Sequence, residues 1–224
     1  MAKIAINPAQ QSAAPSNQLA QAEAPVSQEL TVAMPGQFEG EFTSRDFAIP
    51  SLVICQKSGK LMDDNPSWLG HLIYDKCLDL GTSVKAVFFR VKRYFIEDVP
   101  FGSDALPRKF DTVAEARDAG VDVTDIAELD CLVQVPADFD GGEDIDGTSY
   151  APARYTVRST AFRSTVPILR KDVSLRLKGD LTAGLYNISA VKKTYGPNSW
   201  FAPSLSAAGS TPEAVHRYIR EKLS

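Results

Sequence analysis

Residues 85–96 carry the longest clear strand pattern in the chain, and this segment constrains the fold more than any other. One alternating set of side chains is apolar apart from Arg93 and predicts a core face: Val87, Phe89, Val91 and Phe95. The other set alternates aromatic and cationic groups: Phe88, Arg90, Lys92 and Tyr94. The sequence therefore predicts a sheet with one buried face and one aromatic, basic face.

Charge is sorted by segment along the chain. Residues 1–94 hold nine Lys or Arg and nine Asp or Glu, residues 95–150 hold three against fifteen, and residues 151–224 hold twelve against four. The segment charges of 0, −12 and +8 give the chain its net −4. Basic residues beside aromatics on predicted strands are typical of a protein that holds a polyanion and stacks on its bases.

Length and composition predict one domain with appendages, because 224 residues with 44% hydrophobic side chains can bury a core. No apolar run approaches the roughly 20 residues of a membrane span. The N-terminus lacks the basic region and apolar run of a secretory signal. We expect a protein of the cytoplasm.

Residues 1–35 are rich in Ala, Gln, Ser and Pro, with neither strand nor helix periodicity. Such a segment cannot offset the entropy of ordering, so it predicts a disordered arm. We expect a single folded domain over residues 36–224, with ordered structure from about Phe38 or Phe42. An acidic insertion occupies about residues 97–150 of this domain.

The three cysteines form no CxxC pair, and each lies beside apolar residues: Cys55, Cys77 and Cys131. This pattern predicts buried, reduced thiols. With only His71 and His216 as further soft ligands, we expect no metal and no cofactor.

Local signals place several elements before residue 150. Residues 48–56 predict a buried strand, residues 63–66 a turn and residues 129–135 a further strand. Thr112 and Glu115 form a capping-box pattern for a short helix that Gly120 can close. We expect the Gly-rich acidic stretch 138–147 to be a mobile, solvated loop. It does not predict a calcium site, because the ordered series of ligands that ends in a Glu is missing.

The last third predicts strand, helix, strand and helix. Residues 154–160 alternate as a strand, and a helical stripe of Val166, Leu169, Val173 and Leu177 follows, closed by Gly179. Residues 185–195 predict a strand, 196–199 a turn and 200–202 a returning strand. Thr211 as N-cap and Pro212 at N1 predict a final helix whose apolar side carries Val215, Tyr218, Ile219 and Leu223.

The aromatic and basic strands together define a candidate nucleic-acid-binding site. Phe88, Tyr94 and Trp200 are the candidates for base stacking, with Tyr195 near Trp200 across the turn. The candidates for phosphate contacts are Arg90, Lys92, Arg154, Arg158, Lys192 and Lys193. The structural alternatives are a solvated sheet face and, for Trp200, a lid over the core.

Catalytic patterns are missing from the sequence. Neither histidine lies in a Gly-x-Ser-x-Gly or His-Glu context, and there is no phosphate loop or dinucleotide fingerprint. We therefore expect no enzymatic activity. A carboxylate-dependent nuclease stays the least favoured alternative, because the acids between Glu97 and Asp146 lie mainly in loop-like composition.

Two segments carry a resemblance to a known family: 155–162 (YTVRSTAF) and 185–203 (LYNISAVKKTYGPNSWFAP). Their pattern resembles bacteriophage-encoded single-stranded DNA-binding proteins of the OB-fold type. A third segment, 47–59 (FAIPSLVICQKSG), resembles the start of phage replication-region proteins of similar size. This resemblance implies that residues 36–224 are a single OB-like nucleic-acid-binding domain and that the protein acts in the host-cell cytoplasm. The resemblance implies a mainly β fold with helices (α+β): a five-stranded OB-like barrel with helical insertions and a C-terminal helix.

The same resemblance implies a function in phage DNA replication or recombination, with single-stranded DNA as partner. Replication or recombination proteins and a second copy of the chain are further candidate partners. The family commonly ends in an acidic tail, whereas this chain ends Arg217-Tyr-Ile-Arg-Glu-Lys-Leu-Ser, so the acidic loop 138–146 is the alternative recruiting segment. The competing hypothesis is a phage structural or assembly protein that acts through protein contacts.

Overall fold

The computed structural model describes residues 49–100, 103 and 105–223. The predicted arm at residues 1–35, and the expected start of the fold near Phe38 or Phe42, lie outside the described residues. Among the described residues, no helix has the length and apolar character needed to cross a membrane.

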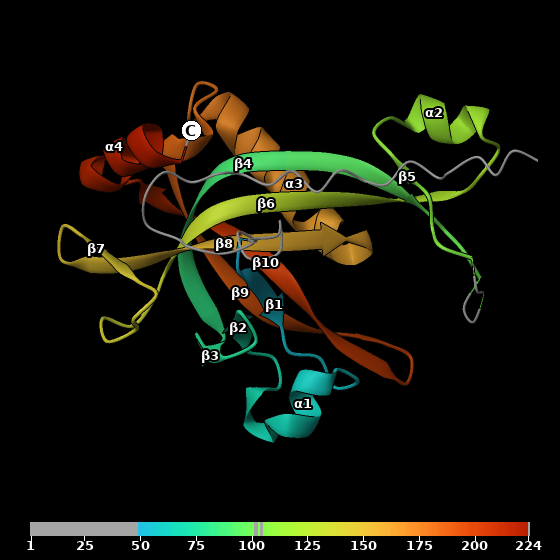
Figure 1. Ribbon diagram of the computed structural model, residues 1–224, viewed down its shortest axis with the longest axis horizontal. Coiled ribbons are helices and arrows are strands. Elements are labelled where there is room, and N and C mark those ends of the chain that lie inside the picture. Colours follow the sequence, from blue (N-terminus) through green and yellow to red (C-terminus); the bar gives the residue numbers. More distant parts are fainter. Residues whose placement is uncertain (1–48, 101–102, 104, 224) are drawn as a thin grey trace, which may run out of the picture. The chain divides into compact units, whose positions relative to one another are not determined.

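A single curled sheet organises these residues (Figure 1). Its main path runs in the order β10 (Asn198–Ser210), β9 (Gly184–Tyr195), β4 (Ser83–Glu97), β6 (Val123–Gln134), β8 (Thr148–Arg158), β1 (Ser51–Ile54), β2 (Leu72–Tyr74) and β3 (Leu78–Asp79). Two short strands pair beside this path, β5 (Lys109–Phe110) with β4 and β7 (Glu143–Ile145) with β8. β1 and β8 are parallel, and the other pairs are antiparallel.

Helices cover both faces of this sheet. The described elements are α1 (Lys60–Asp64), η1 (Pro66–Trp68), α2 (Val113–Asp118), α3 (Ser159–Leu175), η2 (Leu181–Ala183) and α4 (Glu213–Lys222). We call the face that contacts α3 the inner face and the face that contacts α4 the outer face. The mixed α+β class and the C-terminal helix are therefore confirmed.

The core has two parts, one on each face. On the inner face, α3 places Leu169 against a cluster that includes Phe88, Leu129 and Tyr186. On the outer face, α4 places Val215 and Ile219 against Val87, Leu132, Tyr150 and Leu185. Because both faces are apolar at this end of the sheet, consecutive residues of β4 are buried there.

The predicted five-stranded closed barrel is wrong, because the sheet is open between β10 and β3. β1 lies inside the sheet between β8 and β2, so neither of its edges is free to pair with β10. The amide side chain of Gln56, just after β1, contacts β10 instead. Its Nε2 donates to the Phe201 carbonyl at 2.7 Å, and its Oε1 accepts from the Phe201 N–H at 2.9 Å.

Gly70 completes this contact. Its φ of +79° is a left-handed conformation, and a Cβ at this position would lie 2.5 Å from the Phe201 ring. The ring therefore packs directly on backbone. One side-chain amide and one glycine together fasten the edge strand β10 to the segment that follows β1.

Several local predictions are confirmed. β4 spans the predicted strand, and α2 begins at the predicted cap, where Thr112 Oγ1 accepts from the Glu115 N–H at 3.2 Å. The Glu115 side chain reaches one residue beyond the N-cap and accepts from the Asp111 N–H at 3.2 Å, so only the Thr112 half of the capping box has its standard partner. Gly120 follows with φ +67°.

Other local predictions are wrong in part. The predicted turn at residues 63–66 is divided between the end of α1 and the start of η1. The predicted loop 138–147 contains β7, which pairs with β8 through a turn at Asp146 and Gly147 with φ values of 56° and 78°. Asp-Gly is favoured in such turns because both positions need positive φ.

The start of α4 also differs from the prediction. The helix begins at Glu213 with Pro212 as N-cap, and Thr211 Oγ1 is buried without a hydrogen-bond partner among the described residues. The predicted apolar side is present, since Val215 and Ile219 are buried and Tyr218 and Leu223 pack against them.

Cysteine burial follows the prediction at two of three positions. Cys55 and Cys131 are buried, and burial raises the pKa of both thiols. Cys77 is exposed, because it lies in the connection between β2 and β3. All three are free thiols.

The Gln56 contact generates a stability prediction. Gln56→Ala should lower the free energy of unfolding by about 1–3 kcal/mol, since it leaves the N–H and C=O of Phe201 without their partners. Denaturant midpoints of the wild type and the variant measure the change. Lys57→Ala removes an exposed neighbouring side chain and is the matched control; equal midpoints for all three proteins would contradict the prediction.

Candidate nucleic-acid interface

A β-bulge at Phe89 decides which predicted site residues share a face. Phe88 is opposite Cys131 and Arg90 is opposite the adjacent Asp130, so Phe89 is an extra residue in β4. An extra residue reverses the alternation that follows it. Phe88 therefore points to the inner face and Arg90 to the outer face.

Phe88 consequently cannot stack on a base, contrary to the prediction. Its side chain is fully buried in the inner cluster, and its ring centroid lies 5.6 Å from that of Tyr186. Val91, which the sequence pattern predicts to be in the core, lies on the inner face opposite Leu129 and is 40% exposed.

The remaining predicted residues of β4 and β8 lie on the outer face together. Cross-strand neighbours form three rows: Arg90–Asp130–Arg154, Lys92–Glu128–Thr156 and Tyr94–Ile126–Arg158. Cross-strand neighbours share a face, so four cations surround two carboxylates. We call Arg90, Lys92, Tyr94, Arg154 and Arg158, with Glu128 and Asp130, the outer basic face.

Asp130 is the centre of this face. Its Oδ2 accepts from Arg90 Nε at 2.6 Å, and its two oxygens accept from Arg154 Nε at 2.7 Å and Nη2 at 3.2 Å. The Asp130 side chain is 2% exposed, whereas that of Arg90 is 59% exposed. The carboxylate thus holds two guanidinium groups in fixed positions while part of each group faces solvent.

Two opposing effects set the charge state of Asp130. Burial alone raises the pKa of its carboxyl, but the hydrogen bonds from Arg154 and Arg90 outweigh burial and bring the pKa below its ordinary value. Asp130 therefore stays ionised at neutral pH and remains an acceptor for both arginines.

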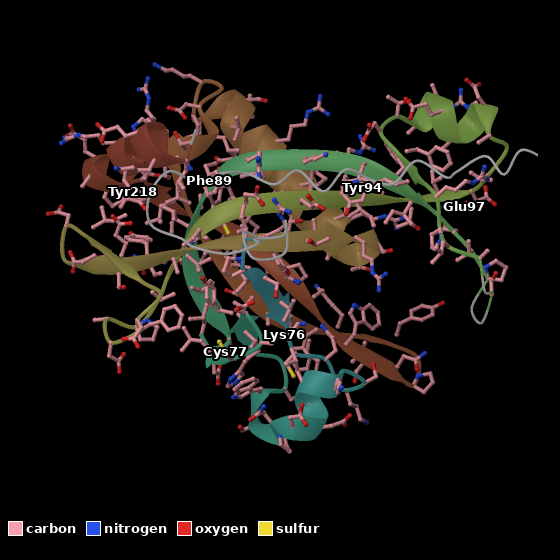
Figure 2. The ribbon with its side chains drawn as sticks, viewed as in Figure 1. Lys76, Cys77, Phe89, Tyr94, Glu97 and Tyr218 are labelled. Carbon is pink, nitrogen blue, oxygen red and sulfur yellow. The ribbon has the colours of Figure 1, made fainter. Side chains whose placement is uncertain are left out.

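Tyr94, labelled on β4 in Figure 2, belongs to the outer basic face, but its side chain is buried. The hydroxyl donates to Glu128 Oε1 at 3.0 Å, and Lys109 Nζ lies 3.9 Å from the ring centroid. Burial, with this hydrogen bond, raises the pKa of the phenol. The predicted stacking role does not fit this conformation, because neither ring face is open to a base.

Lys92 and Arg158 are the free cations of this face. Both are exposed, and neither has an ion-pair partner within the part of the chain that the structure describes. Two positive charges are therefore left uncompensated beside the paired Arg90 and Arg154, which is the electrostatic requirement for a phosphate contact.

The predicted residues of β9 and β10 lie on a separate two-stranded ribbon. Past Ala190, β9 pairs only with β10, and the ribbon extends beyond the rest of the sheet in Figure 1. Gly196 and Pro197 form the connection, with Gly196 at φ +56°. We call residues 191–201 the ribbon.

Register divides the ribbon side chains between two faces. Trp200 is opposite Lys193, and alternation puts Tyr195 on their side, whereas Lys192 is opposite Phe201 on the other side. Tyr195 is 81% exposed, both lysines are exposed and Trp200 is half-buried. The alternative role of Trp200 is a lid over the core. In the structure it is Phe201, and not Trp200, that packs against Gly70.

The structure does not join all ten predicted residues into one platform. β4 pairs with β9 only through Ser83–Val87, before the bulge, so the outer basic face and the ribbon lie on different stretches of the sheet. They form two positive patches. Sequence reasoning also missed Glu128, Asp130 and Lys109, although the polar residues at alternate positions within an apolar strand are a detectable signal for the first two.

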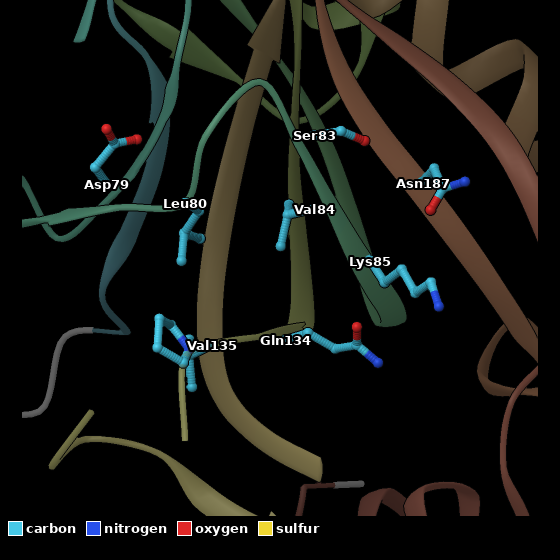
Figure 3. Close-up of a pocket in the computed structure, with 9 residues that line it drawn as sticks. Asp79, Leu80, Ser83, Val84, Lys85, Gln134, Val135 and Asn187 are labelled. Carbon is cyan, nitrogen blue, oxygen red and sulfur yellow. The ribbon is translucent and has the colours of Figure 1, made fainter. Parts of the chain in front are cut away.

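A polar pocket of about 420 Å³ lies between the start of β4 and the end of β6 (Figure 3). Lys85, Gln134 and Asn187 line one part of it, and Asp79 and Leu80 line another. Across the described residues, no group of three or more His, Cys, Asp or Glu side chains is arranged to hold a metal ion.

No known protein family, curated protein or solved structure shows significant similarity to this chain.

The Asp130 cluster predicts an acid-sensitive contribution to stability. Because its folded pKa is lowered, this contribution is present above the ordinary carboxyl pKa of about 4 and is lost as the pH falls through the folded value. Asp130→Asn should lower the free energy of unfolding at neutral pH by about 2–3 kcal/mol and flatten its decrease toward acid pH. Denaturant midpoints across this pH range measure both effects. Asp118→Asn, at an exposed helical position, is the control, and identical pH profiles for the two variants would refute the assignment.

Proposed function

We propose that the chain is a non-catalytic protein that binds single-stranded DNA with little sequence preference. The observation that carries the proposal is the ribbon, where Tyr195 is 81% exposed beside Lys192 and Lys193. A large aromatic ring held in water on a two-stranded ribbon gains stability when a base covers it. Adjacent ammonium groups suit the phosphate that each nucleotide brings.

The ribbon has the parts that a sequence-tolerant contact needs. Tyr195 and Trp200 present π-faces, and every base can stack on a π-face, so the contact does not select among bases. Lys193 shares their face, while Lys192 lies on the reverse face, where it can hold the flanking backbone. Neither contact requires hydrogen bonds to base edges.

The outer basic face supports the same proposal through electrostatics. Lys92 and Arg158 supply unpaired charge, while Asp130 positions Arg90 and Arg154 with donors directed to solvent. In this proposal the face attracts the phosphate backbone and the ribbon stacks on bases. Phe88 and Tyr94 have no role in it, because both rings are covered.

The biological setting within this proposal is bacteriophage DNA replication or recombination. Its support is the sequence resemblance of residues 155–162 and 185–203 to phage single-stranded DNA-binding proteins. The second of these segments contains the ribbon. The acidic stretch 138–146 is the segment we propose to recruit replication or recombination proteins.

Substitutions on the ribbon test the stacking contact. Tyr195→Ala and Trp200→Ala should each weaken binding of a fluorescent oligothymidine by about 1–3 kcal/mol, because each removes one stacking surface. Tyr195→Phe keeps the ring and should keep the affinity. Denaturant midpoints measured on the same samples express affinity per folded molecule. Unchanged affinity in both alanine variants would remove the ribbon from the site.

The salt dependence of binding tests the phosphate contacts. With four to six contacts, the log–log slope of affinity against salt should be roughly −3 to −4, since each contact on a single strand contributes about −0.7. Lys92→Ala and Arg158→Ala should each make the slope shallower by about 0.7. A slope near zero, or tight binding to duplex alone, would reject the proposal and favour a structural or assembly protein. Magnesium-dependent cleavage of the oligonucleotide would instead favour a nuclease.

A further inference from the structure

The ribbon, residues 191–201, carries a positive charge on each of its two faces. The sequence between Leu181 and Pro212 contains no aspartate or glutamate. Lys192 and Lys193 are exposed, and neither has an ion-pair partner among the described residues. Adjacent residues of a strand lie on opposite faces, so the two lysines do as well. A single DNA strand that lies along one face of the ribbon therefore contacts only one of them directly.

Both lysines are accessible at the base of the ribbon. Lys192 is opposite Phe201, whose ring packs against Gly70, yet the lysine side chain itself is exposed. Lys193 is opposite Trp200, one residue nearer the tip. The two positive charges thus occupy adjacent positions along β9, one on each side of the ribbon.

The tip of the ribbon carries an uncovered aromatic ring. Every residue from Thr194 to Ser199 is exposed, and Tyr195, the last residue of β9, is 81% exposed. Tyr195 and Trp200 occupy diagonal positions on one face, about 7–8 Å apart. Neither ring contacts another ring within the part of the chain that the structure describes. The end of the ribbon that extends past the sheet in Figure 1 therefore offers a stacking surface just beyond two oppositely placed cations.

A junction between duplex and single-stranded DNA has the matching chemistry. Two backbones diverge from the last base pair of a junction, and each brings phosphates, so cations on the two faces of a ribbon can contact one backbone each. The last base pair also has one face that no further pair covers, and an aromatic ring can stack on that face. A lone strand brings one backbone only.

We propose that the ribbon enters a junction between duplex and single-stranded DNA, a preference that rests on the proposed single-strand binding. Tyr195 stacks on the last base pair, and Lys192 and Lys193 contact the two separating strands. The flanking backbone at Lys192 is then that of the complementary strand. Trp200, which shares the face of Lys193, stacks on an unpaired base of the strand that Lys193 contacts.

Salt titrations of the full-length protein with two DNA ligands test this contact. The ligands are a fork with two oligothymidine arms and an oligothymidine as long as both arms together. The fork should have a log–log slope steeper by about 0.7 and should bind about fivefold more tightly at about 0.1 M salt, because it brings one more phosphate contact. Lys192→Ala should remove both differences and leave the oligothymidine slope unchanged. Lys193→Ala should make both slopes shallower and keep the difference between them.

A base analogue reports on the position of Tyr195. 2-Aminopurine in the last base pair of the fork should change its fluorescence when the wild type binds, because stacking on an aromatic ring alters its emission. The same fork should show no such change when it is saturated with Tyr195→Ala. An equal change with both proteins would remove Tyr195 from the last base pair.

Lys222→Ala is the charge-matched control, since it removes one cation from an exposed position of α4. It should keep the preference for the fork, and thermal unfolding should confirm that every variant is folded. Equal slopes and affinities for fork and oligothymidine, or loss of slope on both ligands in Lys192→Ala, would overturn the junction and leave single-strand binding intact. A blunt duplex bound as tightly as the fork would also overturn it, because the ribbon would then enter a groove. Binding to neither fork nor oligothymidine would instead overturn the proposed function itself.

Discussion

The bulge at Phe89 is the constraint on which the two faces of the sheet depend. Before it, β4 supplies Phe88 to the inner core and Val87 to the cluster under α4, so the strand is buried on both sides. After it, the reversed alternation sends Arg90 and Lys92 outward opposite Asp130 and Glu128. A strand without the extra residue would bring Arg90 into the apolar cluster around Phe88, at the full cost of an unpaired buried charge.

The parts of the fold that the sequence predicts are those with local causes. The cap at Thr112 and Glu115 forms within five residues, Asp111 to Glu115, and the stripe of Val215 and Ile219 follows helical spacing. The strand at residues 85–96 is visible because its period is maintained on each side of the bulge. In each case the residues that form the pattern lie close together in the sequence.

The parts that could not be predicted depend on partners far away in the sequence. A bulge is defined only against the opposing strand, so Phe88 and Arg90 look equivalent until β6 is paired with β4. Likewise, Tyr94 is lost as a platform through Lys109, and β10 is joined to the segment after β1 through Gln56, which meets Phe201 across 145 residues. The hairpin that carries Lys192 and Lys193 could be predicted from sequence, because its two strands are adjacent along the chain.

The ribbon is held to the rest of the structure at one end only. Gln56 and Gly70 contact Phe201 at its base, and beyond that point β9 pairs only with β10. The length of the ribbon can therefore change without altering the pairing of the rest of the sheet. Inserting one residue into each strand would move the tip by about 3.3 Å and turn its side chains to the opposite side, whereas inserting two would move it about 7 Å and restore the original sides. Homologous ribbons of different length should thus differ by an even number of residues in each strand wherever the chemistry of the tip is retained.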